Sequence, residues 1–232
     1  DGADFLDIGG ESTRPGAEPV SLALEQDRVL PVIEGLKAAG LTAPISIDTR
    51  NAATARAAFQ AGATLFNDVS ALSHDTDSMA FAAEIGATVC LMHASGDPRT
   101  MQDDPTYNNV LIDIYAYLEG RVAACVEAGI RPDRIIVDPG IGFGKTVQHN
   151  VTILSGLSAF QGLGVPVLVG ASRKGFIGRL TGETIAANRA PGSIAAGLVA
   201  AGQGAQIIRA HDVAETRQAL TVWTVASGLW DI

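Results

Sequence analysis

Polar side chains end several apolar runs of this sequence, and their types suit the binding of a polar heterocycle. Asp48, Asn67 and Asp138 each stand at the end of such a run. Carboxylate and amide oxygens accept hydrogen bonds, and a carboxylate pairs well with the two N–H donors of an amidine-like ring edge. We therefore expect these three residues to bind the edge of a flat, nitrogen-rich ring.

A second set of residues at such positions is basic. It consists of Arg14, Lys174, Arg209 and His211. The formal net charge of -9 opposes non-specific attraction to nucleic acid or to an anionic membrane, so a bound anion needs a local cluster of cations. The acceptor set and the basic set together predict a heterocyclic ligand that carries phosphate.

Each of these residues taken alone has a simpler explanation. Asp48 and Asp68 could be helix N-caps, and Arg209 could form a surface ion pair with Asp212. Structural roles would also explain Met92, His74 and His93. The combined pattern is harder to explain by structure alone than any one of its members.

A glycine-rich loop follows the run Ile135–Val137, whose three β-branched residues predict a strand buried on both faces. Asp138 ends this strand, and the segment PGIGFGK then predicts a loop that a flat ligand can approach closely. Two phosphate motifs almost match, but Pro139 replaces the first glycine of a Walker A motif and Lys145 replaces the third glycine of GxGxxG. A plain glycine-rich connection explains this segment about equally well.

The elements that must position these residues form a weak repeat. A Gly-Ala pair followed by a short apolar run recurs from Gly2, Gly62, Gly86 and Gly204, and three looser versions raise the predicted strands to seven. Glycine suits the left-handed position that ends a helix, and the apolar run is then the next strand of a parallel sheet. The predicted helices are 22–39, 52–61 with Asn51 as its N-cap, 112–128, 146–162, 193–203 and 212–228.

Strands and helices therefore alternate, which predicts the α/β class with right-handed crossovers, as a barrel or a doubly wound sheet. Seven strands are one fewer than a closed (β/α)8 barrel contains, and the chain opens on Asp1-Gly2-Ala3, which is typical of the end of a helix. We expect that the first βα unit is lacking. Residues 1–232 are predicted to form a single domain.

Composition limits the class of protein further. With 47% hydrophobic residues, the 232-residue chain can bury a large core. Cys90 and Cys125 form no CxxC motif, so we expect two reduced, mostly buried thiols. The four histidines show no metal-binding spacing. No apolar run reaches the roughly 18 residues of a membrane span, and no signal peptide is recognised, so we expect a cytoplasmic protein.

Seven motifs make the sequence resemble the bacterial dihydropteroate synthases. They are GGESTRPGA (9–17), SIDT (46–49), NDVSAL (67–72), LMHASGDPRTMQ (91–102), DPGIGFGK (138–145), GASRKGFIG (170–178) and RAHD (209–212). The resemblance covers essentially the whole chain, and ESTRPG, SRK and RxHD in this order are highly specific. It implies a TIM barrel that condenses 6-hydroxymethyl-7,8-dihydropterin pyrophosphate with p-aminobenzoate, giving 7,8-dihydropteroate and pyrophosphate with Mg²⁺ as cofactor.

The resemblance also implies roles for individual residues. The pterin pocket would consist of Asp48, Asn67, Asp138 and Lys174, with Met92 and Phe143 packed around the ring. The pyrophosphate would contact Arg209 and His211. Thr13, Arg14 and Pro15 would lie on a loop that closes over p-aminobenzoate, and Ser172 would approach the carboxylate of p-aminobenzoate at a helix N-terminus. Of these residues, Asp48, Lys174 and Arg209 are predicted to be catalytic.

The family's first strand, with an NVTPDSF-type segment whose Asn contributes to the Mg²⁺ site, has no counterpart in this sequence, so no metal ligand is predicted in this chain. The resemblance further implies a homodimer with small-molecule substrates, and the acidic net charge predicts no nucleic-acid or membrane partner. Two alternatives stay open: a pterin-dependent corrinoid methyltransferase domain, which shares the fold and the pocket, and a pterin-binding barrel fragment without activity.

Overall fold

The computed structural model describes residues 1–12, 17–96 and 100–229 of the chain. Its strands are β1 (Leu6–Gly9), β2 (Ile45–Asp48), β3 (Leu65–Asp68), β4 (Thr88–Met92), β5 (Ile135–Asp138), β6 (Leu168–Val169) and β7 (Ile207–Ile208). Each of them lies in one of the apolar runs in which the sequence predicts a strand. The local signal is strong because a short apolar run after a helix-ending glycine has few other solutions than a buried parallel strand.

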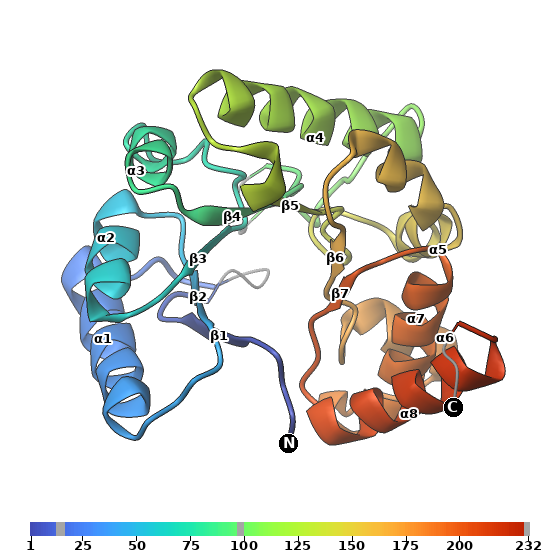
Figure 1. The fold of residues 1–232 in the computed structure, drawn as a ribbon. Helices are drawn as coiled ribbons and strands as arrows, with labels where there is room; N and C mark the ends of the chain where they lie inside the picture. Colours follow the sequence, from blue (N-terminus) through green and yellow to red (C-terminus); the bar gives the residue numbers. More distant parts are fainter. Residues whose placement is uncertain (13–16, 97–99, 230–232) are drawn as a thin grey trace.

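The helices surround the strands (Figure 1). They are α1 (Leu22–Ala38), α2 (Ala52–Ala61), α3 (Ser78–Glu84), α4 (Val110–Glu127), α5 (Val147–Ser155), α6 (Gly175–Thr181), α7 (Ala190–Gly202) and α8 (Val213–Ala226). Short 3₁₀ turns span Pro132–Arg134, Leu157–Leu163 and Ala186–Arg189. The seven-residue helices α3 and α6 escaped prediction because two turns are too short to show a clear apolar periodicity.

The prediction of one helix over 146–162 is wrong. The α-helix ends at Ser155, and a 3₁₀ turn follows Gly156. A β-carbon at Gly156 would lie 2.6 Å from a methyl carbon of Leu111 on α4, so glycine lets the two segments approach each other. Apolar spacing continues across this break, which is why the sequence pattern alone does not reveal it.

All strand pairs are parallel. Strands β1 to β5 pair in sequence order, β6 pairs with β7, and a bridge between Val137 and Val167 joins the two sheets. In Figure 1 the strands follow one another around a common centre with the helices outside, which confirms the predicted α/β class and the TIM-barrel arrangement. Within the described ranges, no pairing joins β7 to β1.

The core lies mainly between the strands and the outer helices. Ile135, Ile136 and Val137 are all buried, as predicted for a strand covered on both faces. Ile136 packs with Cys90 and two leucines in a small separate cluster, whereas its neighbours Ile135 and Val137 belong to the large core. Both cysteines are buried and free. No helix in the described part of the chain combines the length and apolarity needed to cross a membrane.

Candidate active site

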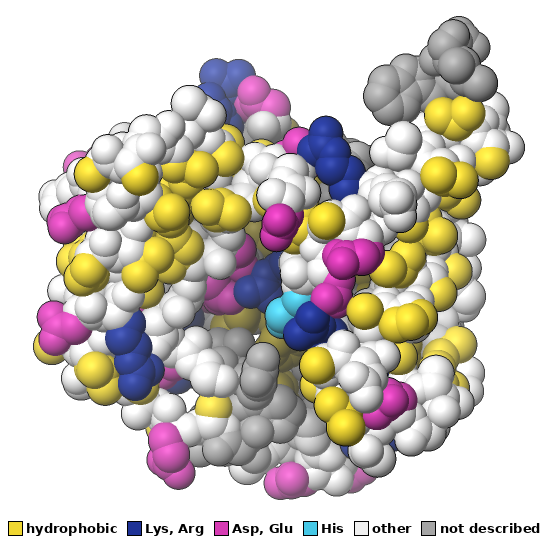
Figure 2. Space-filling view, turned by 90° about the horizontal axis from the view of Figure 1, so that it is seen from below, with side chains coloured by type: hydrophobic (Ala, Val, Ile, Leu, Met, Phe, Trp, Pro, Cys, Tyr) yellow, Lys and Arg dark blue, Asp and Glu magenta, His cyan; other side chains and the backbone are white. Residues whose placement is uncertain are grey.

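The strand ends bring the predicted carboxylates and amide to one mouth of the barrel, together with the described members of the predicted basic set. Register pairs Asp48 of β2 with Asn67 of β3, and Met92 of β4 with Asp138 of β5. Because parallel strands end at the same edge, these side chains lie level with one another. Lys174 precedes α6 and Arg209 follows β7. Figure 2 shows a hollow in which basic, acidic and histidine side chains gather between apolar flanks.

Arg209 holds two carboxylates across this mouth. Its Nε donates to Oδ2 of Asp7 at 2.6 Å, and its Nη2 donates to Oδ2 of Asp48 at 3.3 Å. Asn67 donates from Nδ2 to the same Asp7 oxygen at 3.2 Å. The alternative of a surface ion pair between Arg209 and Asp212 is therefore wrong. Arg209 turns toward β1 and β2, where two carboxylates are within its reach.

Asp7 is a site residue that the sequence analysis missed. It lies within β1 rather than at the end of that strand, so it does not share the position that marks Asp48, Asn67 and Asp138 in the sequence. A signal was present, because Asp7 interrupts the apolar run of β1. A charge inside a predicted parallel strand is costly unless it is paired or has a function. Its contacts place it beside Asn67 and Arg209.

The pKa of the Asp48 carboxyl lies close to neutral pH. Burial, reinforced by the negative charge of Asp7, raises the pKa of Asp48 to about 7, while Arg209 opposes the shift. Burial also raises the pKa of Asp138, against the opposing charge of Lys174. The backbone N–H of Gly140 donates to Oδ1 of Asp138 at 2.7 Å and orients that carboxylate.

Gly140 must be glycine for two reasons. Its φ of +69° lies in the left-handed region, and a β-carbon there would lie 1.9 Å from the carbonyl oxygen of His93. The loop after β5 therefore passes directly against the end of β4. This close approach gives the Pro-Gly segment a structural reason that its sequence alone does not reveal.

Lys174 is joined to the same loop. Its Nζ donates to the carbonyl oxygen of Ile141 and lies 4.5 Å from the centre of the Phe143 ring. Burial lowers the pKa of Lys174 to about 8, and the nearby charge of Asp138 works against this shift. Lys174, Phe143 and Asp138 thus form one connected corner of the mouth, with Met92 buried in the strand beside it.

Lys145 is buried and stabilises the loop from within. Its Nζ lies 2.9 Å from the Phe143 carbonyl oxygen, 3.0 Å from His93 Nδ1 and 3.3 Å from the His93 carbonyl oxygen. Three acceptors match the three hydrogens of an ammonium group. Burial lowers the pKa of Lys145 to about 7 and that of His93 to about 3. The structural role considered for His93 agrees with these contacts.

Ser172 and His211 meet where the β6 and β7 loops adjoin. The Ser172 hydroxyl oxygen accepts the backbone N–H of His211 at 3.1 Å and lies 2.9 Å from its Nδ1. Arg173 pairs with Asp212 through its Nε at 3.1 Å and through a second guanidinium nitrogen. These contacts tie the loop that contains Lys174 to the loop that follows Arg209.

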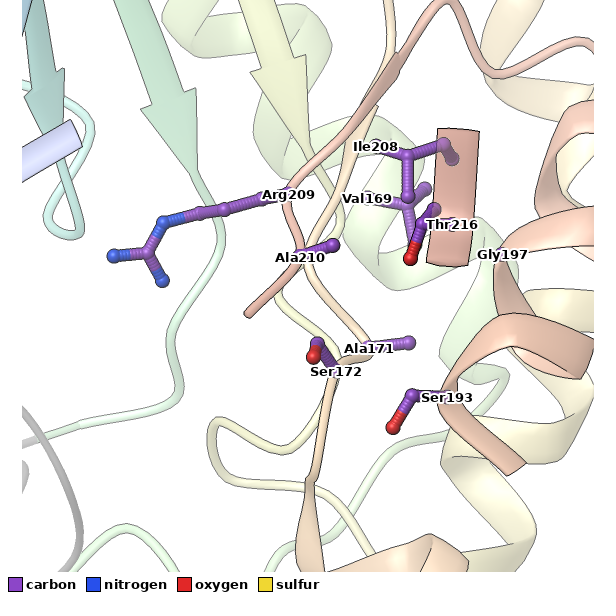
Figure 3. A pocket seen from close by; sticks show the side chains of 9 residues that line it. All are labelled: Val169, Ala171, Ser172, Ser193, Gly197, Ile208, Arg209, Ala210 and Thr216. Carbon is purple, nitrogen blue, oxygen red and sulfur yellow. The ribbon is translucent and has the colours of Figure 1, made fainter. Parts of the chain in front are cut away.

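A small cavity lies behind this junction. It is lined by Val169, Ala171, Ser172, Ser193, Gly197, Ile208, Arg209, Ala210 and Thr216. In Figure 3 the Arg209 side chain extends away from the other lining side chains. The Ser193 hydroxyl is occupied by the carbonyl of Arg189 and the N–H of Arg173. The cavity therefore lies among residues that hold the site's loops in place, and not in the mouth of the barrel.

The remaining predictions have separate outcomes. Thr13, Arg14 and Pro15 lie outside the described residues. Neither Asp48 nor Asp68 is a helix N-cap: Asn51 precedes α2, and Asp68 accepts hydrogen bonds from a turn at Ser70 and Leu72. No group of three or more His, Cys, Asp or Glu that suits a metal ion occurs among the residues that the structure describes.

Comparison with known proteins gives a consistent result. A family model described as pterin binding enzyme matches residues 1–211. The dihydropteroate synthase of Neisseria meningitidis serogroup C is 47% identical over 225 residues, which cover 96% of this chain and 79% of that protein.

Two solved structures are similar in fold as well as in sequence. The Yersinia pestis dihydropteroate synthase in a sulfonamide drug complex superposes with a TM-score of 0.94 at 43% identity, covering 98% of this chain and 82% of that one. The Xanthomonas albilineans enzyme in complex with 7,8-dihydropteroate has a TM-score of 0.88 at 42% identity, with coverage of 97% and 82%.

Proposed function

The chain belongs to the pterin-binding enzymes as a member of the dihydropteroate synthases, and we propose that the mouth of its barrel is the active site. The protein condenses 6-hydroxymethyl-7,8-dihydropterin pyrophosphate with p-aminobenzoate, releasing pyrophosphate and 7,8-dihydropteroate. The observation that carries the site assignment is a network of hydrogen bonds at the mouth, in which Asp7 joins Asn67 to Arg209 and Arg209 in turn joins Asp48.

The acceptor side of the mouth binds the pterin ring in this proposal. Asp138 and Asn67 face donors on the ring edge, while Met92 and Phe143 pack against the ring. Lys174 places a positive charge at one side of this pocket, since its ammonium group lies over the Phe143 ring and close to Asp138. Paired N–H donors on a heterocycle favour a carboxylate that is already oriented, as Asp138 is by Gly140.

The basic side receives the diphosphate. Without substrate, Arg209 is held by Asp7 and Asp48, so a bound diphosphate must compete with two carboxylates for one guanidinium group. His211 follows Arg209 by two residues, and its ring is held by the Ser172 hydroxyl. Moving Arg209 toward the diphosphate would free Asp48 to face the ring, so binding of the anion and exposure of the carboxylate are coupled.

The reaction then follows from where charge develops. The bond between the exocyclic CH₂ and the diphosphate oxygen breaks, the oxygen keeps the electron pair, and the remaining cation is conjugated with the electron-rich ring. The ionised Asp48 stabilises that positive charge, and Arg209 stabilises the negative charge on the leaving group. The amine of p-aminobenzoate forms the new C–N bond and loses a proton to solvent. Ser172 would contact the carboxylate of p-aminobenzoate, and Thr13, Arg14 and Pro15 would help to position that substrate.

We expect the activity to rise with pH around neutrality. The pKa of Asp48 is raised to about 7, so below this pH its carboxyl is largely protonated and cannot stabilise a cation. The value of kcat/KM reports groups of the free enzyme, and its acid limb should therefore be centred near pH 7. Rates of pyrophosphate release between pH 5.5 and 9 test this.

The matched variant is Asp48→Asn, which keeps the shape of the side chain but does not titrate. It should lower kcat/KM by about 10²-fold or more and flatten the acid limb. A wild-type profile that stays flat through neutrality, or an acid limb that survives in Asp48→Asn, would remove Asp48 from this role.

Three finer assignments are part of the same proposal. Mg²⁺ usually binds proteins through one or two carboxylates together with substrate phosphates. Asp7 and Asp48 are engaged by Arg209, so the described residues do not offer a preformed metal site, and Mg²⁺ is assigned to the diphosphate substrate.

Two unpaired thiols favour a reducing compartment, for which we propose the cytoplasm. A homodimer is proposed from the resemblance, and light scattering tests it.

The comparisons favour the synthase over the corrinoid methyltransferase that shares its pocket. Measuring pyrophosphate release with and without p-aminobenzoate separates these activities. A synthase releases pyrophosphate in step with the consumption of p-aminobenzoate, whereas a methyltransferase releases none.

A further inference from the structure

Glu25 is a buried carboxylate for which the proposed reaction gives no role. It lies in the first turn of α1, and it is fully buried although helix residues of this type normally face solvent. A buried carboxylate is costly unless hydrogen bonds satisfy it. The identity of its partners therefore indicates what it does.

The side chains that donate to the Glu25 carboxylate lie just after β2 and in the first turn of α2. The Thr49 hydroxyl donates to Oε1 at 2.6 Å, the Thr54 hydroxyl donates to Oε2 at 2.6 Å, and Asn51 Nδ2 donates to Oε2 at 2.9 Å. One carboxylate thus joins α1 both to the connection between β2 and α2 and to the first turn of α2. This connection begins one residue after Asp48.

Further contacts hold Thr49, the residue that follows Asp48, in place. The Thr49 N–H donates to the carbonyl of Asn67 on the neighbouring strand, and the Thr49 hydroxyl also accepts the N–H of Asn51. Gly10 lies against α1, because a β-carbon there would be 2.7 Å from the Glu25 carbonyl oxygen. The side chain of Thr49 is therefore held by Glu25 on one side while its backbone is held by β3 on the other.

From this arrangement we propose that Glu25 is a positioning residue for Asp48, which it acts on through Thr49 and through its own negative charge. The inference rests on the proposed function of Asp48. Asp48 is faced by Asp7 of β1, Asp68 of β3, Glu25 of α1, and the cations Arg209 and Lys174. Burial raises the pKa of Asp48 most, followed by the charges of Asp7 and Asp68, and the charge of Glu25 adds a smaller rise.

The first test removes the charge. Glu25→Gln keeps the size of the side chain, and it should move the acid limb of kcat/KM to lower pH, because one negative neighbour of Asp48 is gone. The shift should be smaller than the one that loss of the Asp7 charge would cause, since Asp7 raises the pKa of Asp48 more. The value of kcat at high pH should fall about tenfold, since the amide cannot accept all three hydrogen bonds. Glu34→Gln, on the exposed side of the same helix, is the control and should leave both quantities unchanged.

A second pair of variants separates positioning from stability. Thr49→Val and Thr54→Val each remove a hydroxyl that donates to Glu25 at the same distance, but only Thr49 adjoins Asp48. Both should lower the melting temperature. Thr49→Val should also lower kcat several-fold, and Thr49→Ser should restore it, whereas Thr54→Val should keep the wild-type kcat and pH profile.

The outcomes distinguish failure of this inference from failure of the proposed function. If Asp48→Asn lowers activity while Glu25→Gln keeps the acid limb and kcat of the wild type, Glu25 is only structural and the inference is overturned. Equal losses of kcat in Thr49→Val and Thr54→Val overturn it as well. If Asp48→Asn itself leaves activity intact, it is the role of Asp48 that fails. Should Glu25→Gln not fold, the threonine pair still decides the matter.

Discussion

Replacing Asp138 by Ala should abolish tight binding of the pterin substrate. Asp138 is buried at the end of β5, and Gly140 orients its carboxylate toward the mouth. The variant would leave the ring donors without their charged acceptor in a site shielded from water. Truncating one partner of a buried, hydrogen-bonded charge pair costs about 3–5 kcal/mol. Because each 1.4 kcal/mol is tenfold in affinity, the dissociation constant should rise about 10²-fold to several thousandfold.

Calorimetry with the pterin pyrophosphate measures this directly, and a matched control is available on β3. Asp68 is also a buried carboxylate at a strand end, but its oxygens are occupied by Ser70 and Leu72. Asp68→Asn should lower the melting temperature and leave the affinity for pterin within about twofold. An Asp138→Ala protein that is folded and binds pterin as tightly as the wild type would remove Asp138 from the pocket.

Arg209→Ala should give the second large effect, on the diphosphate rather than on the ring. The guanidinium group is the cation that bridges Asp7 and Asp48 at the mouth. In the reaction this side chain would move to contact the diphosphate leaving group. Its loss removes a charge-assisted contact that becomes stronger as the C–O bond breaks. A loss of about 3–4 kcal/mol corresponds to a fall in kcat/KM of about 10²- to 10³-fold. The dissociation constant of free pyrophosphate should rise as well.

The same variant should change the pH dependence in a defined direction. Arg209 opposes the rise in the pKa of Asp48, so without it the acid limb of the residual activity should move to higher pH. Arg134→Ala is a suitable control, because Arg134 precedes β5 at the opposite end of the strand and donates to Thr88. Pyrophosphate binding that is unchanged in Arg209→Ala, measured by competition, would contradict the assignment.

The sequence by itself determined the strands and the acceptor set. Asp48, Asn67 and Asp138 were found because each ends an apolar run, and parallel strands must end at a common edge. The Gly-Ala repeat predicted four of the strands, and its looser versions predicted the other three. The longer helices followed from their apolar periodicity, whereas α3 and α6 were too short to show one.

Only the tertiary structure decided which charges meet. Arg209 and Asp7 are 202 residues apart, and their contact depends on how the two ends of the chain approach each other around the barrel. Nor does the helical pattern of α1 explain why Glu25 is buried, since its partners belong to another element. Periodicity reports which face of an element is apolar. It does not report which polar group another element will supply, because that depends on distances set by the packing of the whole chain.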